Sequence, residues 1–233
     1  MRKVISWFWR LIWKTILWFF ILSIGLVVLY RFVPVPFTPL MIIRWVEYKT
    51  EDQDFGIEYS WTPVADISKP MQKAVVASED QKFPDHNGFD FDAMKTAWEK
   101  NKQGKTVKGA STISQQTAKN VFLWPARTYL RKGLEAYFTI LIELIWPKER
   151  ILEVYLNVIE VGSGKYGVTT AAKSFYNTTP DKLQPSQAAM IAALLPSPRR
   201  WNPNRPTPYL IGRQAWIRVQ MNNLPDLPWW KSN

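Results

Sequence analysis

An uncharged apolar run near the start of the chain constrains the fold more than any other feature of the sequence. Residues 15–30 are sixteen residues without a charge, and extension back past Lys14 to Leu11 gives a segment of twenty. A helix of about 20 residues spans the roughly 30 Å hydrocarbon core of a bilayer. Trp13 and Tyr30 lie at its two ends, as in the aromatic belts of membrane helices. The run therefore predicts a transmembrane helix.

Signal peptides and buried core helices contain similar runs. A signal peptide ends at small residues, and residues 30–34 (YRFVP) offer no such cleavage site, which favours a retained span. Residues 1–44 carry six basic and no acidic side chains, and four of the basic ones precede the span. By the positive-inside rule we expect the N-terminus in the cytoplasm and the rest of the chain outside. That location argues against nucleic acid as a partner, in spite of the net charge of +11.

The composition limits the chemistry available to the rest of the chain. There is no Cys, which excludes disulfides, Cys-ligated zinc, iron–sulfur clusters and thiol nucleophiles. His86 is the only histidine, so a zinc site of several imidazoles is excluded and a Ser-His-Asp triad would have to use it. Carboxylates, Lys and Arg remain as the reactive groups.

Helix signals dominate from about residue 66 onward. A last helix is expected over residues 209–223, and the polar, Lys-rich residues 101–108 predict a mobile loop. There is no repeat and no convincing run of strands, so the sequence predicts a mostly α domain. The expected helix starts are Ser68, Asp90 or Asp92, Thr128, Pro147 and Pro185.

Residues 79–90 place four acids and the only histidine within twelve residues, where a helix is expected to end. A carboxylate beside an aromatic side chain at the edge of a cleft suits a general base, because desolvation raises the pKa of carboxylates. The alternative is a solvated helix end with an Asp-capped turn that has no catalytic role. Spacing alone does not decide between this interpretation and a general base.

Two further clusters are polar or basic. Residues 109–120 are rich in hydroxyl and amide side chains, which predicts either an anion site at a helix N-terminus or an ordinary polar helix start. Arg131 and Glu135 are spaced i and i+4, which is typical of an intrahelical ion pair. The alternative is a phosphate clamp beside this carboxylate. Its basic side chains would be Lys119, Arg127, Arg131 and Lys132.

Five sequence strings occur together and in order over about residues 66–205. They are EDQKFPDHNGFD (79–90), GASTISQQTAKN (109–120), RKGLEA (131–136), KERILEVYLN (148–157) and AALLPSP (192–198). With these motifs the chain resembles the peptidoglycan glycosyltransferases, glycosyltransferase family 51. One membrane span precedes them and no transpeptidase domain follows. The chain is therefore similar to the monofunctional members of the family, which are related to the glycosyltransferase domain of bifunctional penicillin-binding proteins.

The resemblance implies a mainly α, lysozyme-like glycosyltransferase domain with a membrane-proximal hydrophobic subdomain, preceded by one N-terminal transmembrane helix. We expect residues 1–33 to form a cytoplasmic stub and the span, and residues 34–65 a membrane-proximal linker. The glycosyltransferase domain is expected over residues 66–224, and a tail over residues 225–233.

The resemblance also implies roles for individual residues. Glu79 matches the catalytic base, and Glu135 matches a second carboxylate that orients the basic cluster or helps a divalent ion hold pyrophosphate. The basic set Lys119, Arg127, Arg131 and Lys132 would stabilise the pyrophosphate leaving group. Further matches to substrate-contacting positions are Ser111, Gln115, Gln116 and Asn120. Some members carry an acid where this chain has Arg150, so no role is carried over there.

The implied substrates are lipid II and the growing glycan chain, used at the outer face of a bacterial inner membrane. Membrane lipid and cell-division or penicillin-binding proteins are the expected partners. No tightly bound cofactor is expected, although Mg²⁺ or Mn²⁺ would be the assisting ion. Two alternatives are a membrane-anchored, lysozyme-like muramidase and a non-catalytic scaffold of the division machinery.

Overall fold

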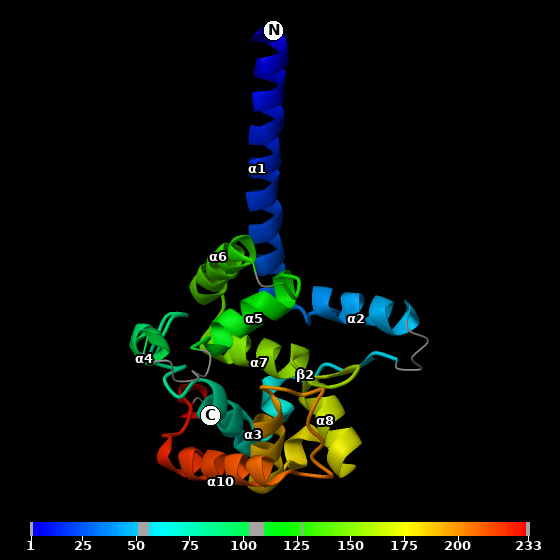
Figure 1. Cartoon of the computed structure of the whole chain (residues 1–233), viewed down its shortest axis with the longest axis vertical. Coiled ribbons are helices and arrows are strands. Elements are labelled where there is room, and N and C mark those ends of the chain that lie inside the picture. Colours follow the sequence, from blue (N-terminus) through cyan, green and yellow to red (C-terminus); the bar gives the residue numbers. More distant parts are fainter. Residues whose placement is uncertain (1, 51–55, 103–109, 127, 232–233) are drawn as a thin grey trace. The chain divides into compact units, whose positions relative to one another are not determined.

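The structure is a computed structural model, and it describes residues 2–50, 56–102, 110–126 and 128–231 (Figure 1). The predicted loop at residues 101–108 falls almost entirely outside the described residues. The chain divides into two compact units, residues 1–34 and residues 35–233. Both are mainly helical, as the sequence predicts.

The first unit is the single helix α1 (Arg2–Phe32). Within it, Ser6–Phe32 is long and apolar enough to cross a membrane. The prediction of one N-terminal helix able to span a bilayer is therefore confirmed.

The second unit holds the remaining elements. Residues 35–65 belong to this unit and include a helix and a strand, while the predicted boundary at residue 66 stays a prediction. Its helices are α2 (Pro39–Thr50), α3 (Lys69–Glu79), α4 (Phe91–Lys102), α5 (Ile113–Phe122), α6 (Tyr129–Ile145), α7 (Lys148–Val158), α8 (Gly167–Tyr176), α9 (Pro185–Leu194) and α10 (Pro208–Asn223). Short 3-10 turns cover Val64–Asp66, Pro180–Lys182 and Pro228–Lys231.

Capping hydrogen bonds confirm the predicted helix starts at Ser68 and Thr128. The Ser68 hydroxyl accepts from the Met71 amide at the start of α3, and the Thr128 hydroxyl accepts from the Arg131 amide at the start of α6. Of the two candidates before α4, it is Asp90 whose carboxylate accepts from a first-turn amide, at 2.9 Å. Each cap satisfies a backbone N–H group that the helix itself leaves without a partner.

A small sheet, which the sequence analysis did not predict, joins three short strands. They are β1 (Glu58–Tyr59), β2 (Glu160–Gly162) and β3 (Lys165–Tyr166), in the order β1-β3-β2. β1 is parallel to β3, and β2 is antiparallel to it. Strands of two or three residues are too short to show the alternation by which strands are found in a sequence. Gly164 makes the turn between β2 and β3 at a positive φ of 69°, where a Cβ atom would lie 2.6 Å from the Gly56 oxygen.

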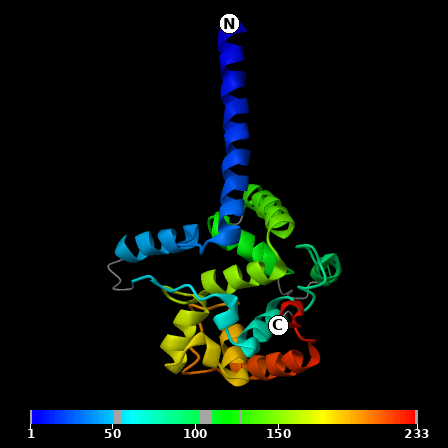
Figure 2. The same cartoon turned by 180° about the vertical axis from the view of Figure 1, so that it is seen from behind.

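The helices of the second unit pack in two groups. α9 packs against α3 and α10, while α5 packs against α6 and α7. Figures 1 and 2 show α5, α6 and α7 on one side of this unit and α10 on the opposite side. Residues 188–194 of α9 are all buried, as expected for a central helix that is apolar on every face. α3 belongs to the first group, and its C-terminal residue Glu79 meets α5 of the second group through the Gln116 side chain.

The C-terminal segment folds back onto α3. Gln72 on α3 is 3% exposed, and its amide nitrogen donates to the carbonyl oxygens of Val64 and Ile67 at 3.1 and 2.9 Å. Its amide oxygen accepts from the indole nitrogens of Trp229 and Trp230 at 3.1 and 3.0 Å. One buried side chain therefore satisfies four polar groups from two distant parts of the sequence.

We expect Gln72→Leu to destabilise the protein by about 2–4 kcal/mol, because it leaves buried donors and acceptors without partners. Chemical denaturation in detergent, followed by far-UV circular dichroism, measures the change. Gln220→Leu is the matched control, since Gln220 makes one long, exposed contact to Gln81, and it should change stability by less than about 0.5 kcal/mol. Equal stabilities of the two variants would contradict this role of Gln72.

Candidate active site

Glu79 is the last residue of α3, and it lines a pocket of about 270 Å³. The Gln116 amide on α5 donates to its Oε2 atom at 3.0 Å, and the Ser78 hydroxyl donates to its Oε1 atom at 3.1 Å. Ser111, a predicted substrate contact, lines the same pocket. The structure therefore presents Glu79 as a half-buried carboxylate, oriented on both oxygens and open to a cavity.

Asp80, the next carboxylate along the chain, is used in a different way. It is 7% exposed, and its Oδ2 atom accepts from the Ile113 amide at the start of α5, at 3.0 Å. His86 Nε2 lies 3.0 Å from both of its oxygens. Because His86 Nδ1 accepts from the Gly88 amide, the ring proton is on Nε2, which donates to Asp80. Asp80 therefore joins two segments, and it also lines the pocket beside Glu79.

The second motif forms the start of α5. Thr112 is the N-cap, and the Gln115 side chain completes a capping box by accepting from the Thr112 amide at 3.0 Å. Gln115 is 3% exposed, so its side chain serves the cap; the predicted contact with substrate stays a prediction. Gln116, one residue on, points to Glu79 instead.

Glu135 on α6 is the centre of the basic cluster. It is 3% exposed, pairs with Arg131 at 2.6 Å and also pairs with Lys132. The intrahelical ion pair predicted from the i and i+4 spacing is therefore present. Arg127 lies outside the described residues.

Lys119 interacts electrostatically both with the basic cluster on α6 and with Glu79. Burial lowers the pKa of Lys119 from its ordinary value, and the neighbouring Arg131 and Lys132 lower it further. The Glu135 and Glu79 carboxylates act in the opposite direction. Lys119 on α5 thus lies within electrostatic range both of Glu79, which ends α3, and of the cations on α6.

A second pocket, of about 330 Å³, adjoins these cations. Lys119, Asn120 and Arg131 line it, together with two residues that the sequence analysis did not select, Arg44 on α2 and Glu160 on β2. Within the described part of the chain, the Nε atoms of Arg44 and Arg131 and the Oε1 atom of Glu160 have no hydrogen-bond partner. Burial raises the pKa of Glu160, and Arg44 opposes that shift. The pocket is therefore lined by three basic side chains and one carboxylate.

The described residues do not provide three or more side chains that would hold a metal ion by themselves. Over the described ranges, no group of three or more His, Asp or Glu side chains is arranged to bind a metal. Both oxygens of Glu135, the carboxylate expected to assist such an ion, are engaged by Arg131 and Lys132.

Comparisons with known proteins identify the family of this chain. A family model described as Transglycosylase matches residues 49–222. The chain belongs to the transglycosylase family. Three relatives are each named biosynthetic peptidoglycan transglycosylase. The protein of Bdellovibrio bacteriovorus is 57% identical over 92% of this chain and 85% of its own length. Those of Pseudomonas fluorescens strain SBW25 and Bacteroides thetaiotaomicron are 49% and 50% identical, over 92% and 91% of this chain and 91% and 86% of their own lengths.

We expect inorganic pyrophosphate to bind this transglycosylase less tightly as the pH rises, with the decline beginning below 10.5, the ordinary pKa of a lysine, because the pKa of Lys119 is lowered. Glu135→Gln removes a carboxylate that raises this pKa, so the decline should move to lower pH. Isothermal titration calorimetry between about pH 7 and about pH 10 tests both statements. Glu99→Gln, on the exposed side of α4, is the control. The same pH dependence in Glu135→Gln and wild type would contradict the assignment.

Proposed function

We propose that this enzyme polymerises lipid II into glycan chains, with Glu79 as the general base and inversion at the reacting carbon. The family and the names of its relatives support the broader activity, a peptidoglycan glycosyltransferase of cell-wall synthesis. The observation that carries the finer assignment is an oriented carboxylate, Glu79, within electrostatic range of Lys119, which in turn interacts with the cations on α6.

In the proposed reaction, Glu79 takes the proton from the sugar 4-hydroxyl of the acceptor lipid II. The hydroxyl oxygen then attacks C1 of the growing chain, and the bond from C1 to the oxygen of undecaprenyl pyrophosphate breaks. The bonding electrons leave with the pyrophosphate, and a direct displacement inverts α to β. One base suffices for this step because the leaving group is already a stable anion.

The leaving pyrophosphate needs positive charge and no proton donor. Lys119 and Arg131 line the second pocket, and Arg44 adds a third basic side chain there. Fixed cations stabilise charge that develops in the transition state, typically by a few kcal/mol for each well-placed donor. The proposal therefore needs no tightly bound cofactor.

The muramidase alternative is less well supported by the site. Hydrolysis of a glycoside uses one carboxylic acid to protonate the leaving sugar oxygen and a second carboxylate nearby. The second carboxylate that the sequence offered, Glu135, accepts hydrogen bonds from Arg131 and Lys132 and is not available as a proton donor.

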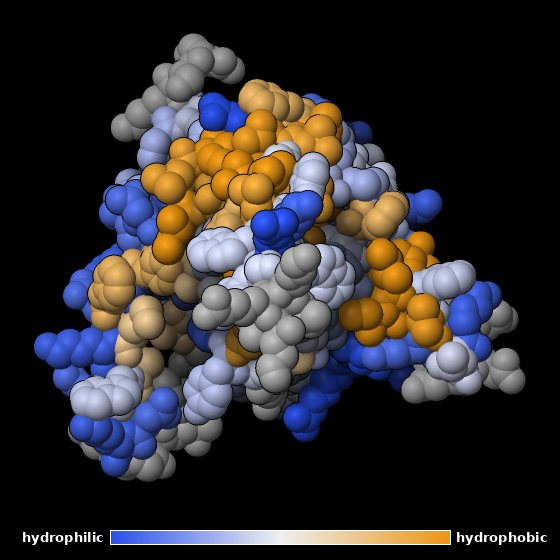
Figure 3. Space-filling view, turned by 90° about the horizontal axis from the view of Figure 1, so that it is seen from above, coloured by the Kyte–Doolittle hydropathy of each residue, from blue (hydrophilic) through white to orange (hydrophobic). Residues whose placement is uncertain are grey.

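The apolar surfaces suit a substrate that is held in lipid. α1 is long enough to anchor the enzyme, and we place its N-terminus in the cytoplasm and the catalytic unit outside, on the basis of the basic residues that precede the span. α2 and α6 also carry exposed apolar side chains, and Figure 3 shows orange, hydrophobic patches on the face seen from above. Among them are Ile42, Trp45 and Val46 on α2, and Leu130, Ile140 and Leu144 on α6. We propose that these patches contact membrane lipid beside the substrate.

We expect Glu79→Gln to lower the rate of lipid II polymerisation by about 10²- to 10⁴-fold, the usual contribution of a general base. The measurement is polymer formation from labelled lipid II by the full-length protein in detergent. Glu99→Gln, an exposed substitution of the same type, should retain wild-type activity.

Three other outcomes would count against the proposal in different ways. Full activity of Glu79→Gln would contradict the assignment of Glu79 as the general base. A wild-type protein that forms no polymer under varied detergent and metal conditions would support the scaffold. Release of fragments from purified cell wall, without action on lipid II, would support the muramidase.

A further inference from the structure

Both oxygens of the Glu79 carboxylate accept a hydrogen bond, and each donor is held by another side chain behind it. Gln116 stands between Glu79 and Tyr155, and Ser78 stands between Glu79 and Arg213. We propose that Tyr155 and Arg213 are positioning residues for catalysis, acting through Gln116 and Ser78 to fix the rotamer of the base. This inference rests on the proposed function, in which Glu79 takes the acceptor proton.

The hydrogen bonds that link Tyr155, Gln116 and Glu79 have only one consistent set of donors. An ionised carboxylate only accepts, so the Gln116 atom that faces Glu79 must be the amide nitrogen, and the amide oxygen then faces Tyr155. That oxygen also only accepts, so the Tyr155 hydroxyl donates to it, at 3.3 Å. Burial raises the pKa of Tyr155 well above its ordinary value, which keeps the hydroxyl protonated. The orientation of Gln116 is therefore fixed from behind.

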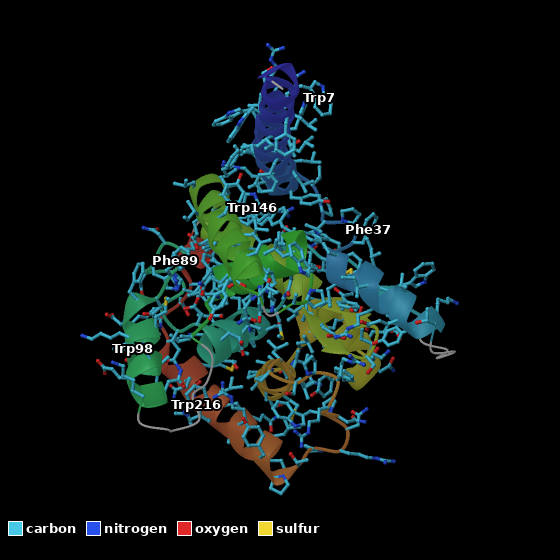
Figure 4. The ribbon with its side chains drawn as sticks, turned by 45° about the horizontal axis from the view of Figure 1, so that its top comes forward. Trp7, Phe37, Phe89, Trp98, Trp146 and Trp216 are labelled. Carbon is cyan, nitrogen blue, oxygen red and sulfur yellow. The ribbon has the colours of Figure 1, made fainter. Side chains whose placement is uncertain are left out.

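The Arg213 side is constrained in the same way. Arg213 on α10 donates from Nη2 to the Ser78 carbonyl oxygen at 3.0 Å and to the Ser78 hydroxyl oxygen at 3.2 Å. A guanidinium has no acceptor, so the Ser78 hydroxyl proton must point elsewhere. Glu79 Oε1 lies 3.1 Å from that oxygen, closer than the 3.5 Å of the Ala192 carbonyl. The guanidinium also lies over the Trp216 ring at 4.3 Å, and Trp216 is labelled beside α10 in Figure 4.

Two donors fix the plane of the carboxylate without blocking its function. Each carboxylate oxygen has two lone pairs, so one hydrogen bond to each still leaves acceptor capacity for the substrate proton. A base held in one rotamer spends more of its time in reach of the acceptor hydroxyl. A displacement of about 1 Å can lower a rate by about 10²-fold, so loss of either support should act on turnover. Neither Tyr155 nor Arg213 needs to touch the substrate for this effect.

The test uses the full-length enzyme in detergent and steady-state polymerisation of lipid II. Tyr155→Phe, Ser78→Ala and Arg213→Met each remove the donor and keep most of the side-chain volume. We expect kcat to fall by about 10-fold or more while KM changes by less than about twofold, as for groups that act only in the chemical step. Ser78→Thr keeps a hydroxyl donor and should recover activity to within about threefold of wild type.

Matched controls separate positioning from folding. Tyr176→Phe and Ser186→Ala make the same chemical changes elsewhere in the domain and should leave both kcat and KM unchanged. Thermal unfolding by circular dichroism checks that each variant is folded. If Arg213→Met unfolds, Tyr155→Phe, which removes a single oxygen atom, still decides the proposal.

The outcomes distinguish this inference from the proposed function. An inactive Glu79→Gln together with wild-type kcat in Tyr155→Phe and Ser78→Ala would overturn the positioning roles and leave the base in place. A rise in KM at constant kcat would also overturn them, because it would indicate a contact with substrate. Full activity of Glu79→Gln would instead remove the base on which the inference rests.

Discussion

The site depends on the bond between the end of α3 and the start of α5, made by the buried Asp80 carboxylate. This carboxylate accepts hydrogen bonds from the Ile113 amide and from His86. It therefore connects the end of α3 both to the turn that contains His86 and to the start of α5. Charged acceptors of this kind form stronger hydrogen bonds than neutral ones, and they are costly to leave unpaired when buried. Because of this bond, the Glu79 carboxylate on α3 lies beside the Gln116 amide and within electrostatic range of Lys119, both on α5.

A second buried charge supports the same junction from α6 and α7. The Glu143 carboxylate accepts from the Ser114 hydroxyl and from the Lys148 ammonium group. Lys148 also donates to the His86 carbonyl oxygen and lies 4.6 Å from the centre of the Phe83 ring. The acidic turn, residues 80–90, is thus held by Asp80 on one side and by Lys148 on the other, as a preorganised site requires.

The sequence predicted those features that depend on neighbouring residues. N-caps such as Ser68 and Thr128 act over three residues, and the Arg131–Glu135 pair over four, so they can be found without a structure. Arg44, Glu160 and Arg213 were not selected, because nothing in their local sequence separates them from ordinary surface charges. They reach the site through contacts between elements far apart in the chain, such as the bond from Arg213 to Ser78 across 135 positions. The three-strand sheet and α8 were missed as well.

The return of the C-terminal segment to α3 has a consequence for the order in which the molecule is assembled. Trp229 donates to Gln72 across 157 positions, and its ring lies edge-on to Phe83 in the acidic turn, with 6.3 Å between ring centres. Contacts between such distant positions form late in folding, since the closing loop is long. In a chain made from its N-terminus, the turn beside the proposed base gains its final packing only after residue 229 has been synthesised and has reached α3. A nascent chain that has not yet reached residue 229 therefore contains the proposed base, Glu79, without the packing that surrounds the neighbouring turn in the folded protein.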